Sequence, residues 1–375
     1  MKTIENLIPY HKTTHLHDLF PNPEEVLFFD IETTGLSPKG ASVYLIGCAF
    51  FTEQGWMCRQ YFADTPDEES DILQQFCSFA ANFSAFWNFN GTTFDIPFLQ
   101  AKCKKHNIPP FDPAENHDMY RMIRPFKNLL HLSGCRQKQL EEYIGLFRED
   151  KFNGGELIDL YHLYGENRDE NLLQVLLLHN FEDIQGMLEL SSIVSIPLLF
   201  SSYEFVPADA ALQSVIDARG NEKKEFQITL QLQAALPVPL ACHSNDLGIG
   251  SIFFAGRDKK VMIKIPVTSC ELKYFYKDFK NYSYLPEEDQ VIHKSVAAYV
   301  DKSRRMPATA ANCYTRKQGD FVPAFKGFST PLPLFRTEHK SNNAFLLPDA
   351  SLLQDQEALH AYVQSVLKCI VTSNK

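Results

Sequence analysis

The spacing of apolar residues in the first 200 positions alternates between the periods of strands and helices. Short apolar runs predict strands at 26–32, 43–51, 60–62 and 86–89. Apolar positions three and four residues apart predict helices at 68–83, 98–106 and 171–196. Strands that are followed by a helix, a further strand and more helices are typical of an α/β domain with a mixed sheet. Pro197 and the pair Ser201-Ser202 end the last helix and mark a domain boundary.

The second half of the chain has a different pattern. Residues 226–233 alternate strictly between apolar and polar, which predicts a strand with one wet face, and 261–265 predicts another. Helices are predicted at 289–300 and 350–370. The predicted organisation is a lead-in at 1–23, an α/β domain at 24–200 and a smaller α+β domain of unrecognised type at 201–375, which binds nucleic acid or a partner.

Charge is distributed unevenly along the 375 residues. The formal net charge is −10, which argues against a simple basic nucleic-acid binder. Residues 257–326, however, carry 14 Lys and Arg against 8 Asp and Glu, a local +6. This asymmetry fits a metal site in the first domain and a surface facing phosphates in the second, although an ordinary solvated surface has the same signature.

Basic and aromatic residues interleave at 273–277 and 280–284. They can form a surface that stacks on unpaired bases, or half-buried strands with lysines on the wet side, and the strand spacing favours the second interpretation. The nearby acids Glu287, Glu288 and Asp289 with His293 can be read as a metal site, but a cap for the predicted helix at 289 explains them more simply.

Cysteine usage and the N-terminus bear on the compartment. The nine cysteines include no C-x-x-C pair, which is typical of buried free thiols in a reducing compartment. Residues 1–20 lack the apolar core of a signal peptide, and no apolar run approaches a membrane span. We therefore expect a cytoplasmic protein that has no membrane partner.

Two acids on the first predicted strand suggest chemistry. Asp30 and Glu32 are two residues apart, so their side chains lie on the same face of the strand. Two ionised carboxylates in an apolar setting are costly unless a cation lies between them. Ligands that are all oxygens suit Mg²⁺ or Mn²⁺. The strand therefore predicts a metal-dependent hydrolase.

Two further stretches carry candidate site residues. Asp95 follows the break at Asn90-Gly91 and precedes a helix, which it could instead simply cap. His179 and Asp183 are four residues apart on a predicted helix and so share one face, although many such pairs are only solvated.

The order of these motifs resembles that of a known family. Three motifs follow one another: a D-x-E strand, Asn90-Gly91 with Phe94-Asp95, and His179-Asn180 with Asp183. In this order they are similar to the DEDDh group of 3′–5′ exonucleases in the RNase H-like superfamily. More narrowly, they resemble the YprB-type RNase H-like domain. The runs 29–36 and 44–47 share this resemblance, which covers about 24–196. One departure is the spacing of four between His179 and the last Asp, where many DEDDh enzymes have five.

The resemblance implies a metal-dependent 3′–5′ exonuclease that uses two divalent cations, Mg²⁺ or Mn²⁺. It implies that Asp30 bridges the cations, that Glu32 and Asp183 complete one metal site, and that Asp95 serves the other. His179 is then the general base. The implied substrate contacts are a backbone contact near Thr33 to the 3′-OH, a wedge at Leu36, and further contacts from Thr34, Gly35 and Asn90.

The implied partner is nucleic acid, as single-stranded 3′ ends trimmed in DNA repair or RNA turnover, and the sequence leaves a protein partner such as a helicase open. Two other interpretations remain. One is a catalytically idle RNase H-like module that binds nucleic acid or a partner protein, and the other is a structure-specific endonuclease. Intact acids at all four positions argue against the idle module.

Overall fold

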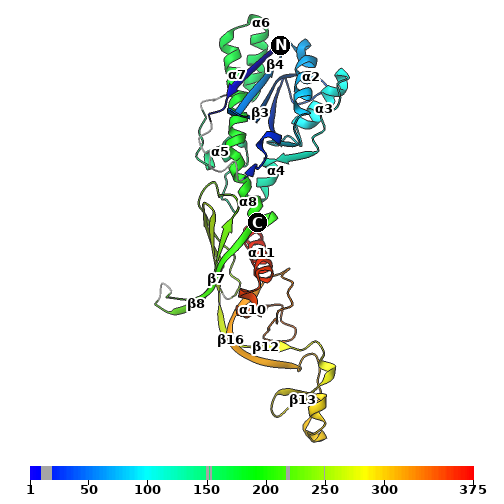
Figure 1. The fold of residues 1–375 in the computed structure, drawn as a ribbon, viewed down its shortest axis with the longest axis vertical. Helices are drawn as coiled ribbons and strands as arrows, with labels where there is room; N and C mark the ends of the chain where they lie inside the picture. Colours follow the sequence, from blue (N-terminus) through cyan, green and yellow to red (C-terminus); the bar gives the residue numbers. More distant parts are fainter. Residues whose placement is uncertain (10–18, 149–151, 153, 217–219, 249) are drawn as a thin grey trace. The chain divides into compact units, whose positions relative to one another are not determined.

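The chain divides into two compact units. The computed structural model describes residues 1–9, 19–148, 152, 154–216, 220–248 and 250–375. The first unit comprises Met1–Leu198 with Gln233–Val238, and the second comprises Leu199–Leu232 with Pro239–Lys375 (Figure 1). Part of the predicted lead-in, residues 10–18, lies outside the described residues.

The first unit follows the predicted alternation of strands and helices. Its strands are β1 (Lys2–Leu7), β2 (Val26–Thr33), β3 (Val43–Thr52), β4 (Gly55–Phe62), β5 (Ala85–Asn88) and β6 (Glu115–Asp118). Its main helices are α2 (Glu69–Ala80), α3 (Asp95–His106), α4 (Met119–Ile123), α5 (Gln137–Tyr143), α6 (Gly154–Asn167), α7 (Glu170–Leu190) and α8 (Ser195–Pro197). The α/β class with a mixed sheet is confirmed.

The six strands form one sheet in the order β1-β4-β3-β2-β5-β6. Strands β1, β4, β3 and β2 pair antiparallel, whereas β5 and β6 run parallel to β2. Lys2–Leu7 differ from the predicted lead-in because they pair with β4 as the edge strand. Their side chains are mostly exposed, so the apolar alternation that identifies a strand is weak there.

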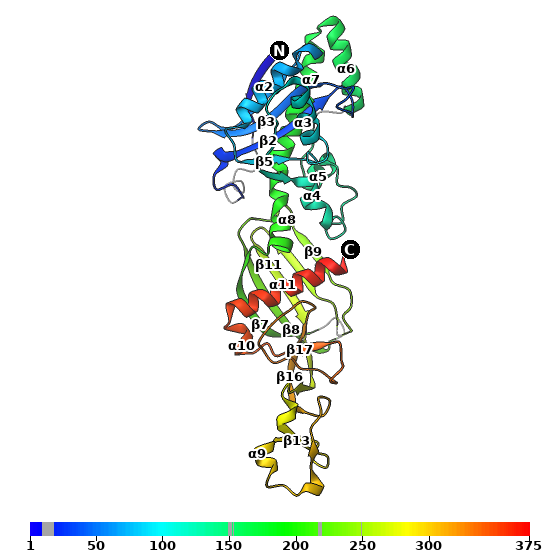
Figure 2. The ribbon, with the colours of Figure 1, turned by 90° about the vertical axis from the view of Figure 1, so that its right-hand side faces the viewer.

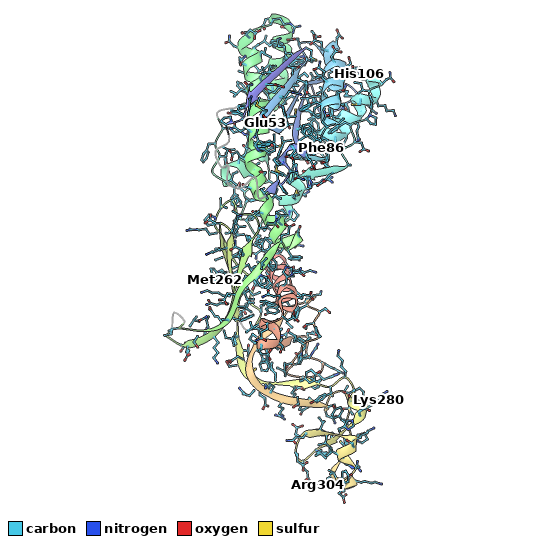
Figure 3. The ribbon with its side chains drawn as sticks, in the orientation of Figure 1. Glu53, Phe86, His106, Met262, Lys280 and Arg304 are labelled. Carbon is cyan, nitrogen blue, oxygen red and sulfur yellow. The ribbon has the colours of Figure 1, made fainter. Side chains whose placement is uncertain are left out.

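Helices cover both faces of this sheet (Figure 1). Leu27, Phe29 and Ile31 of β2 face a core that includes Ile72 and Phe76 of α2. Aromatic rings are frequent in this core, and Phe86 of β5, labelled in Figure 3, packs edge-on against Phe29 and Phe111. On the opposite face, a second core joins residues of β3 and β4 to Leu157, Tyr161 and Tyr164 of α6 and to Leu173 and Leu176 of α7.

Helix α7 is long and largely buried. With the short turns that follow it, Glu170–Ser202 is long and apolar enough to cross a membrane by length and composition, so the expectation that no run approaches a span was wrong for this segment. Within its most apolar window, 83% is buried inside the protein. Such burial is typical of a core helix, which is apolar on more than one side because it packs between a sheet and other helices.

The second unit is rich in strands. Its strands are β7 (Phe205–Ile216), β8 (Glu222–Leu232), β9 (Leu240–His243), β10 (Phe253–Arg257), β11 (Lys260–Pro266), β12 (Thr268–Phe275), β13 (Tyr282–Leu285), β14 (Gln290–His293), β15 (Met306–Pro307), β16 (Tyr314–Ala324) and β17 (Ala344–Leu346). Its helices are α9 (Lys294–Ala297), α10 (Ala350–Leu353) and α11 (Gln356–Ser373). A sheet-rich domain with few helices agrees with the predicted α+β class.

The described residues of this unit form three antiparallel sheets, in the orders β7-β8-β11-β10-β9, β12-β16-β17 and β14-β13-β15. Figure 2 shows α11 crossing the five-stranded sheet, where Tyr362 packs near Phe226 and His360 stacks on Phe205. The opposite side of that sheet is wet, and Met262 of β11 is exposed there (Figure 3). The alternation at 226–233 therefore indicated this strand correctly.

The predicted helix at 289–300 was wrong in its first half. Gln290–His293 pair with Tyr282–Leu285 as a hairpin, and Asp289 lies in its turn with φ 46°. Helix α9 begins only at Lys294, and the side chain of His293 caps it. Asp289 is therefore a turn residue, and hairpin pairing with the neighbouring strand β13 overrode the local helical signal.

Candidate active site

Asp30 and Glu32 point from β2 toward α7. Their odd-numbered neighbours on β2 face the core under α2 and α3, so the even positions face the other side of the sheet. There, the Asn180 amide nitrogen donates to Asp30 Oδ2 at 3.1 Å. His179 Nε2 lies 3.5 Å from Glu32 Oε1. The two acids thus share one face, as the strand period predicts, and meet residues of the helix that the sequence singled out.

Asp95 reaches the same region from the first turn of α3. Its Oδ1 accepts a hydrogen bond from the Ile31 backbone N–H at 3.1 Å, between the two acids of β2. The carboxylate therefore fastens the helix to the strand, which goes beyond capping its own helix. Burial, together with the charges of Asp118 and Asp183, raises the pKa of Asp95 to about 7.

A tight turn sets the start of α3. Asn90 adopts φ 65°, and Asp118 accepts hydrogen bonds from the backbone N–H groups of Asn90 at 2.9 Å and Thr92 at 3.3 Å. A side chain at Gly91 would collide with Asn88, since a Cβ there would lie 2.6 Å from Asn88 Oδ1. This turn brings Asp95 to the acids of β2, so Asp118 acts on the site through the backbone.

His179 and Asp183 lie one turn apart on α7. His179 Nε2 is 3.1 Å from Asp183 Oδ2. The other oxygen of Asp183 pairs with the Arg148 guanidinium, which also pairs with buried Glu141. Burial raises the pKa of Asp183, but the hydrogen bond from His179 and the charge of Arg148 outweigh it and hold this pKa below its usual value.

Asp30 occupies the least compensated position of this acid cluster, which we define as Asp30, Glu32, Asp95, His179 and Asp183. Burial raises its pKa well above the usual range, and the charges of Asp183, Asp95 and Glu32 raise it further. Ligand atoms of Glu32, His179 and Asp183 all lie within 4.8 Å of one another. Converging carboxylates with unbalanced negative charge are the donor set that Mg²⁺ or Mn²⁺ binds. The residues present therefore fit a divalent-cation centre.

The expected substrate contacts divide into two kinds. Thr33 and Thr34 are used within their own loop, because Thr33 Oγ1 donates to the Gly35 carbonyl at 2.9 Å and Thr34 Oγ1 accepts from Ser42 N at 2.8 Å. Leu36, at the tip of this loop, is 86% exposed and is available to a ligand. The Asn90 carboxamide oxygen accepts from Thr93 Oγ1 at 2.6 Å, so this side chain shapes the turn before α3.

Sequence reasoning assigned no role to several residues that complete the cluster. They are Gln60, Asp118, Glu141, Arg148 and Asn180, and all are largely buried. Glu141 and Arg148 are separated from Asp183 by more than 30 positions and carry no recognisable motif. The position of Asn180 directly after His179 could have drawn attention to it, but its hydrogen-bond partners Gln60 and Asp30 lie on strands that are distant in the sequence.

The interleaved aromatic and basic stretch of the second unit has the structure of half-buried strands. Tyr276 stacks on Tyr282 with ring centroids 4.9 Å apart, and Tyr274 packs against Phe335 at 6.0 Å. Lys280 is exposed nearby (Figure 3). The tyrosine rings contact each other, so the interpretation as strand residues agrees better with these contacts than a stacking platform does.

The comparison with protein families addresses the first unit. Residues 27–194 match the model of the RNase_H_2 family, described as RNase_H superfamily. Residues 27–194 are an RNase H-like domain. The match supports a nuclease activity in general terms, and the candidate metal centre lies within the matched residues. No curated protein matches the chain.

Solved structures resemble the chain only distantly. A family B DNA polymerase from the archaeon Pyrobaculum calidifontis is 11% identical with a TM-score of 0.39, over 93% of this chain and 46% of the polymerase. E. coli exonuclease I with bound zinc and single-stranded DNA is 12% identical with a TM-score of 0.28, over 55% of this chain and 54% of the exonuclease. The matched region thus spans about half the length of each of these proteins, and at these scores neither likeness carries an argument about function.

Proposed function

We propose that the RNase H-like domain is a metal-dependent 3′–5′ exonuclease of the DEDDh group, and more narrowly of the YprB type. Its substrate would be the single-stranded 3′ end of a nucleic acid, in the cytoplasm. The observation that carries the proposal is the acid cluster itself. Four carboxylates converge from β2, α3 and α7, and burial together with the three other negative charges raises the pKa of Asp30 well above its usual range.

Asp30, Glu32, Asp95 and Asp183 would hold two divalent cations, which when bound supply an activated water and neutralise charge on the scissile phosphate. The residues of the chain prepare this site before any substrate arrives. The Ile31 N–H fixes Asp95, and Arg148 fixes Asp183, so less reorganisation is needed when the site is loaded.

His179 would act as the general base. Its Nε2 faces Asp183 Oδ2 and Glu32 Oε1, so this ring nitrogen points into the acid cluster and, when it is unprotonated, would take a proton from a water held there. An imidazole is suited to proton transfer near neutral pH. The spacing of four residues places His179 and Asp183 on one face of α7, which supports the assigned role.

The loop that contains Leu36 would contact the terminal nucleotide. Leu36 is exposed at the end of a loop that is closed by the hydrogen bonds of Thr34 to Ser42. An apolar side chain held on an ordered loop can pack against a base at low entropic cost. Backbone groups near Thr33 and the turn at Asn90 would lie near the same end of the substrate.

The test is a time course on a single-stranded DNA and on an RNA of the same sequence, each labelled at its 5′ end. Wild type and Asp30→Ala are compared in Mg²⁺, in Mn²⁺ and in chelator. We expect a ladder that shortens from the 3′ end, that requires metal and that Asp30→Ala abolishes. Polymer preference follows from the relative rates on the two substrates.

Two other outcomes would replace the proposal. Internal cuts that appear without a ladder would indicate an endonuclease. Binding to either polymer without cleavage in any metal, unchanged by Asp30→Ala, would indicate a catalytically idle binding module. Both results use the same substrates and the same variant.

A further inference from the structure

Three residues on neighbouring strands line up across the sheet at Asp30. In the register of the first unit, Asp30 of β2 lies opposite Gly47 of β3, and Gly47 lies opposite Gln60 of β4. Side chains in such a row project from the same face of the sheet. An acid and an amide thus flank a glycine, which contributes no side chain to the row.

Asn180 of α7 fills the space over that glycine. It is fully buried, and its Oδ1 lies only 2.1 Å from the point where a Cβ at Gly47 would be. Any other residue at position 47 would therefore displace the Asn180 amide. The glycine is required here by close approach, since its backbone conformation is that of an ordinary strand.

The hydrogen bonds determine which way the Asn180 amide points. Gln60, which is 1% exposed, donates from Nε2 to the Leu177 carbonyl at 2.8 Å and to Asn180 Oδ1 at 3.0 Å. Because Gln60 offers donors on that side, the Asn180 oxygen faces Gln60 and its nitrogen faces Asp30. Asn180 Nδ2 then donates to Asp30 Oδ2 at 3.1 Å.

We propose that Asn180 is a positioning residue, which Gln60 and Gly47 orient so that it holds the metal-binding carboxylate of Asp30. This inference rests on the proposed function, because it deepens the role of Asp30 in that site. An amide donor can fix one oxygen of Asp30 without adding a positive charge that would compete with cations. Arg148 holds Asp183 differently, since it brings a full charge to the edge of the cluster.

The test compares Asn180→Ala, Gly47→Ala and the double variant of both. Asn82→Ala, at an exposed turn position just after α2, is the matched control for the loss of an asparagine. For each full-length protein, Mn²⁺ affinity is measured by calorimetry, cleavage by the single-strand assay and the midpoint of thermal unfolding by circular dichroism. The metal titration gives a readout that does not depend on catalysis.

We expect Asn180→Ala to weaken Mn²⁺ binding roughly 10- to 100-fold, the usual effect of losing a group that orients a ligand. Gly47→Ala should weaken it to a similar degree and also lower the unfolding midpoint, because the new methyl group collides with Asn180. The double variant should recover thermal stability, since the collision is gone, while Mn²⁺ affinity stays at the level of Asn180→Ala. Asn82→Ala should match wild type in metal binding.

Recovery of both thermal stability and Mn²⁺ affinity in the double variant would overturn the proposal. The close approach of Asn180 to Gly47 would then serve packing alone and would not position Asp30. The proposal would also be overturned by an Asn180→Ala protein that binds Mn²⁺ and cleaves within twofold of wild type, or by a wild type that binds no Mn²⁺. Failure of the proposed function has a different signature: wild type binds Mn²⁺ and cleaves neither polymer, while Asn180→Ala still lowers the affinity.

Discussion

Two groups of acids in this protein have opposite electrostatics. In the RNase H-like domain, Asp30 is half-buried among Glu32, Asp95 and Asp183, and its pKa is raised well above the usual range. In the second unit, Asp289 accepts hydrogen bonds from Tyr284 at 2.8 Å and Tyr314 at 2.7 Å and pairs with Arg316. Those hydrogen bonds and the charge of Arg316 lower the pKa of Asp289 to about 2.

The difference separates a site from a structural element. The protein itself satisfies Asp289, so this acid needs no ligand and fixes the turn of the β13–β14 hairpin. Among the described residues, Asp30 has three acidic neighbours, an amide donor in Asn180 and the ring of His179 nearby, and the excess of negative charge can be offset by a bound cation. Acidic residues stand close together in both stretches of sequence, so clustering alone would not have told them apart.

The sharpest test of this contrast compares Asp183→Asn with Asp289→Asn. Removing a charged ligand from the proposed metal centre should lower the single-strand cleavage rate about 10⁴-fold, since cation chemistry contributes several kcal/mol to the barrier. Asp289→Asn should leave the rate within about twofold of wild type. Equal losses in the two variants would erase the distinction between the two acid groups.

The arginines that pair with the two groups of acids should contribute differently to the free energy of unfolding. Arg148 is 7% exposed and joins Glu141 to Asp183, so Arg148→Leu leaves buried carboxylates without their partner. We expect a loss of about 3–5 kcal/mol in the free energy of unfolding, measured with urea in the presence of chelator. Arg316 is 46% exposed, so water screens its ion pairs, and Arg316→Leu should lower the free energy of unfolding far less than Arg148→Leu does. A larger loss in the free energy of unfolding for Arg316→Leu than for Arg148→Leu would contradict this contrast.

The pH dependence of stability should have opposite signs in the two units. With chelator present, folded Asp95 keeps its proton up to about pH 7, whereas the unfolded residue loses it near pH 4. The folded state therefore binds more protons between these values, and stability falls as pH rises from about 4 to 7, by up to about 1.4 kcal/mol per pH unit. Asp95→Asn should flatten this slope in urea unfolding followed from pH 4 to 8.

The contribution of Asp289 to stability changes with pH in the opposite direction. Its folded pKa of about 2 lies below the unfolded value near 4, so its contribution is complete above pH 4 and is lost as pH falls toward 2. Asp289→Asn should weaken the acid sensitivity of the second unit and leave the slope between pH 4 and 7 unchanged. A slope in that window that disappears in Asp289→Asn and persists in Asp95→Asn would reverse the assignment.

The smallest effects are expected at exposed apolar side chains. Leu36 and Tyr299 are 86% and 92% exposed, and neither substitution to Ala should change the unfolding free energy by more than about 0.5 kcal/mol. Leu36→Ala should nevertheless slow cleavage about tenfold, since burying a leucine against a base contributes about 1.5 kcal/mol. Tyr299→Ala should have no such effect in the same assay. Loss of activity at Tyr299 would extend the substrate surface to the second unit.

The parts of the fold that local patterns encode were predictable. The alternation on β2 placed Asp30 and Glu32 on one face, and the helical spacing placed His179 beside Asp183, because both relations depend only on the geometry of a single element. Lys2–Leu7 and Gln290–His293 were not recognised as strands, since their pairing partners, β4 and β13, decide their conformation. Pairing between strands is not recorded in a local period.

The sequence by itself determined which residues can hold a cation and which elements carry them, because residue type and period are local properties. The tertiary structure decided how those residues are held. In the folded protein Arg148 pairs with Asp183, the Ile31 N–H donates to Asp95, and the Asn180 amide packs in the space over Gly47. Each of these contacts joins segments that are distant in the chain, and only the packed fold brings them within hydrogen-bond distance.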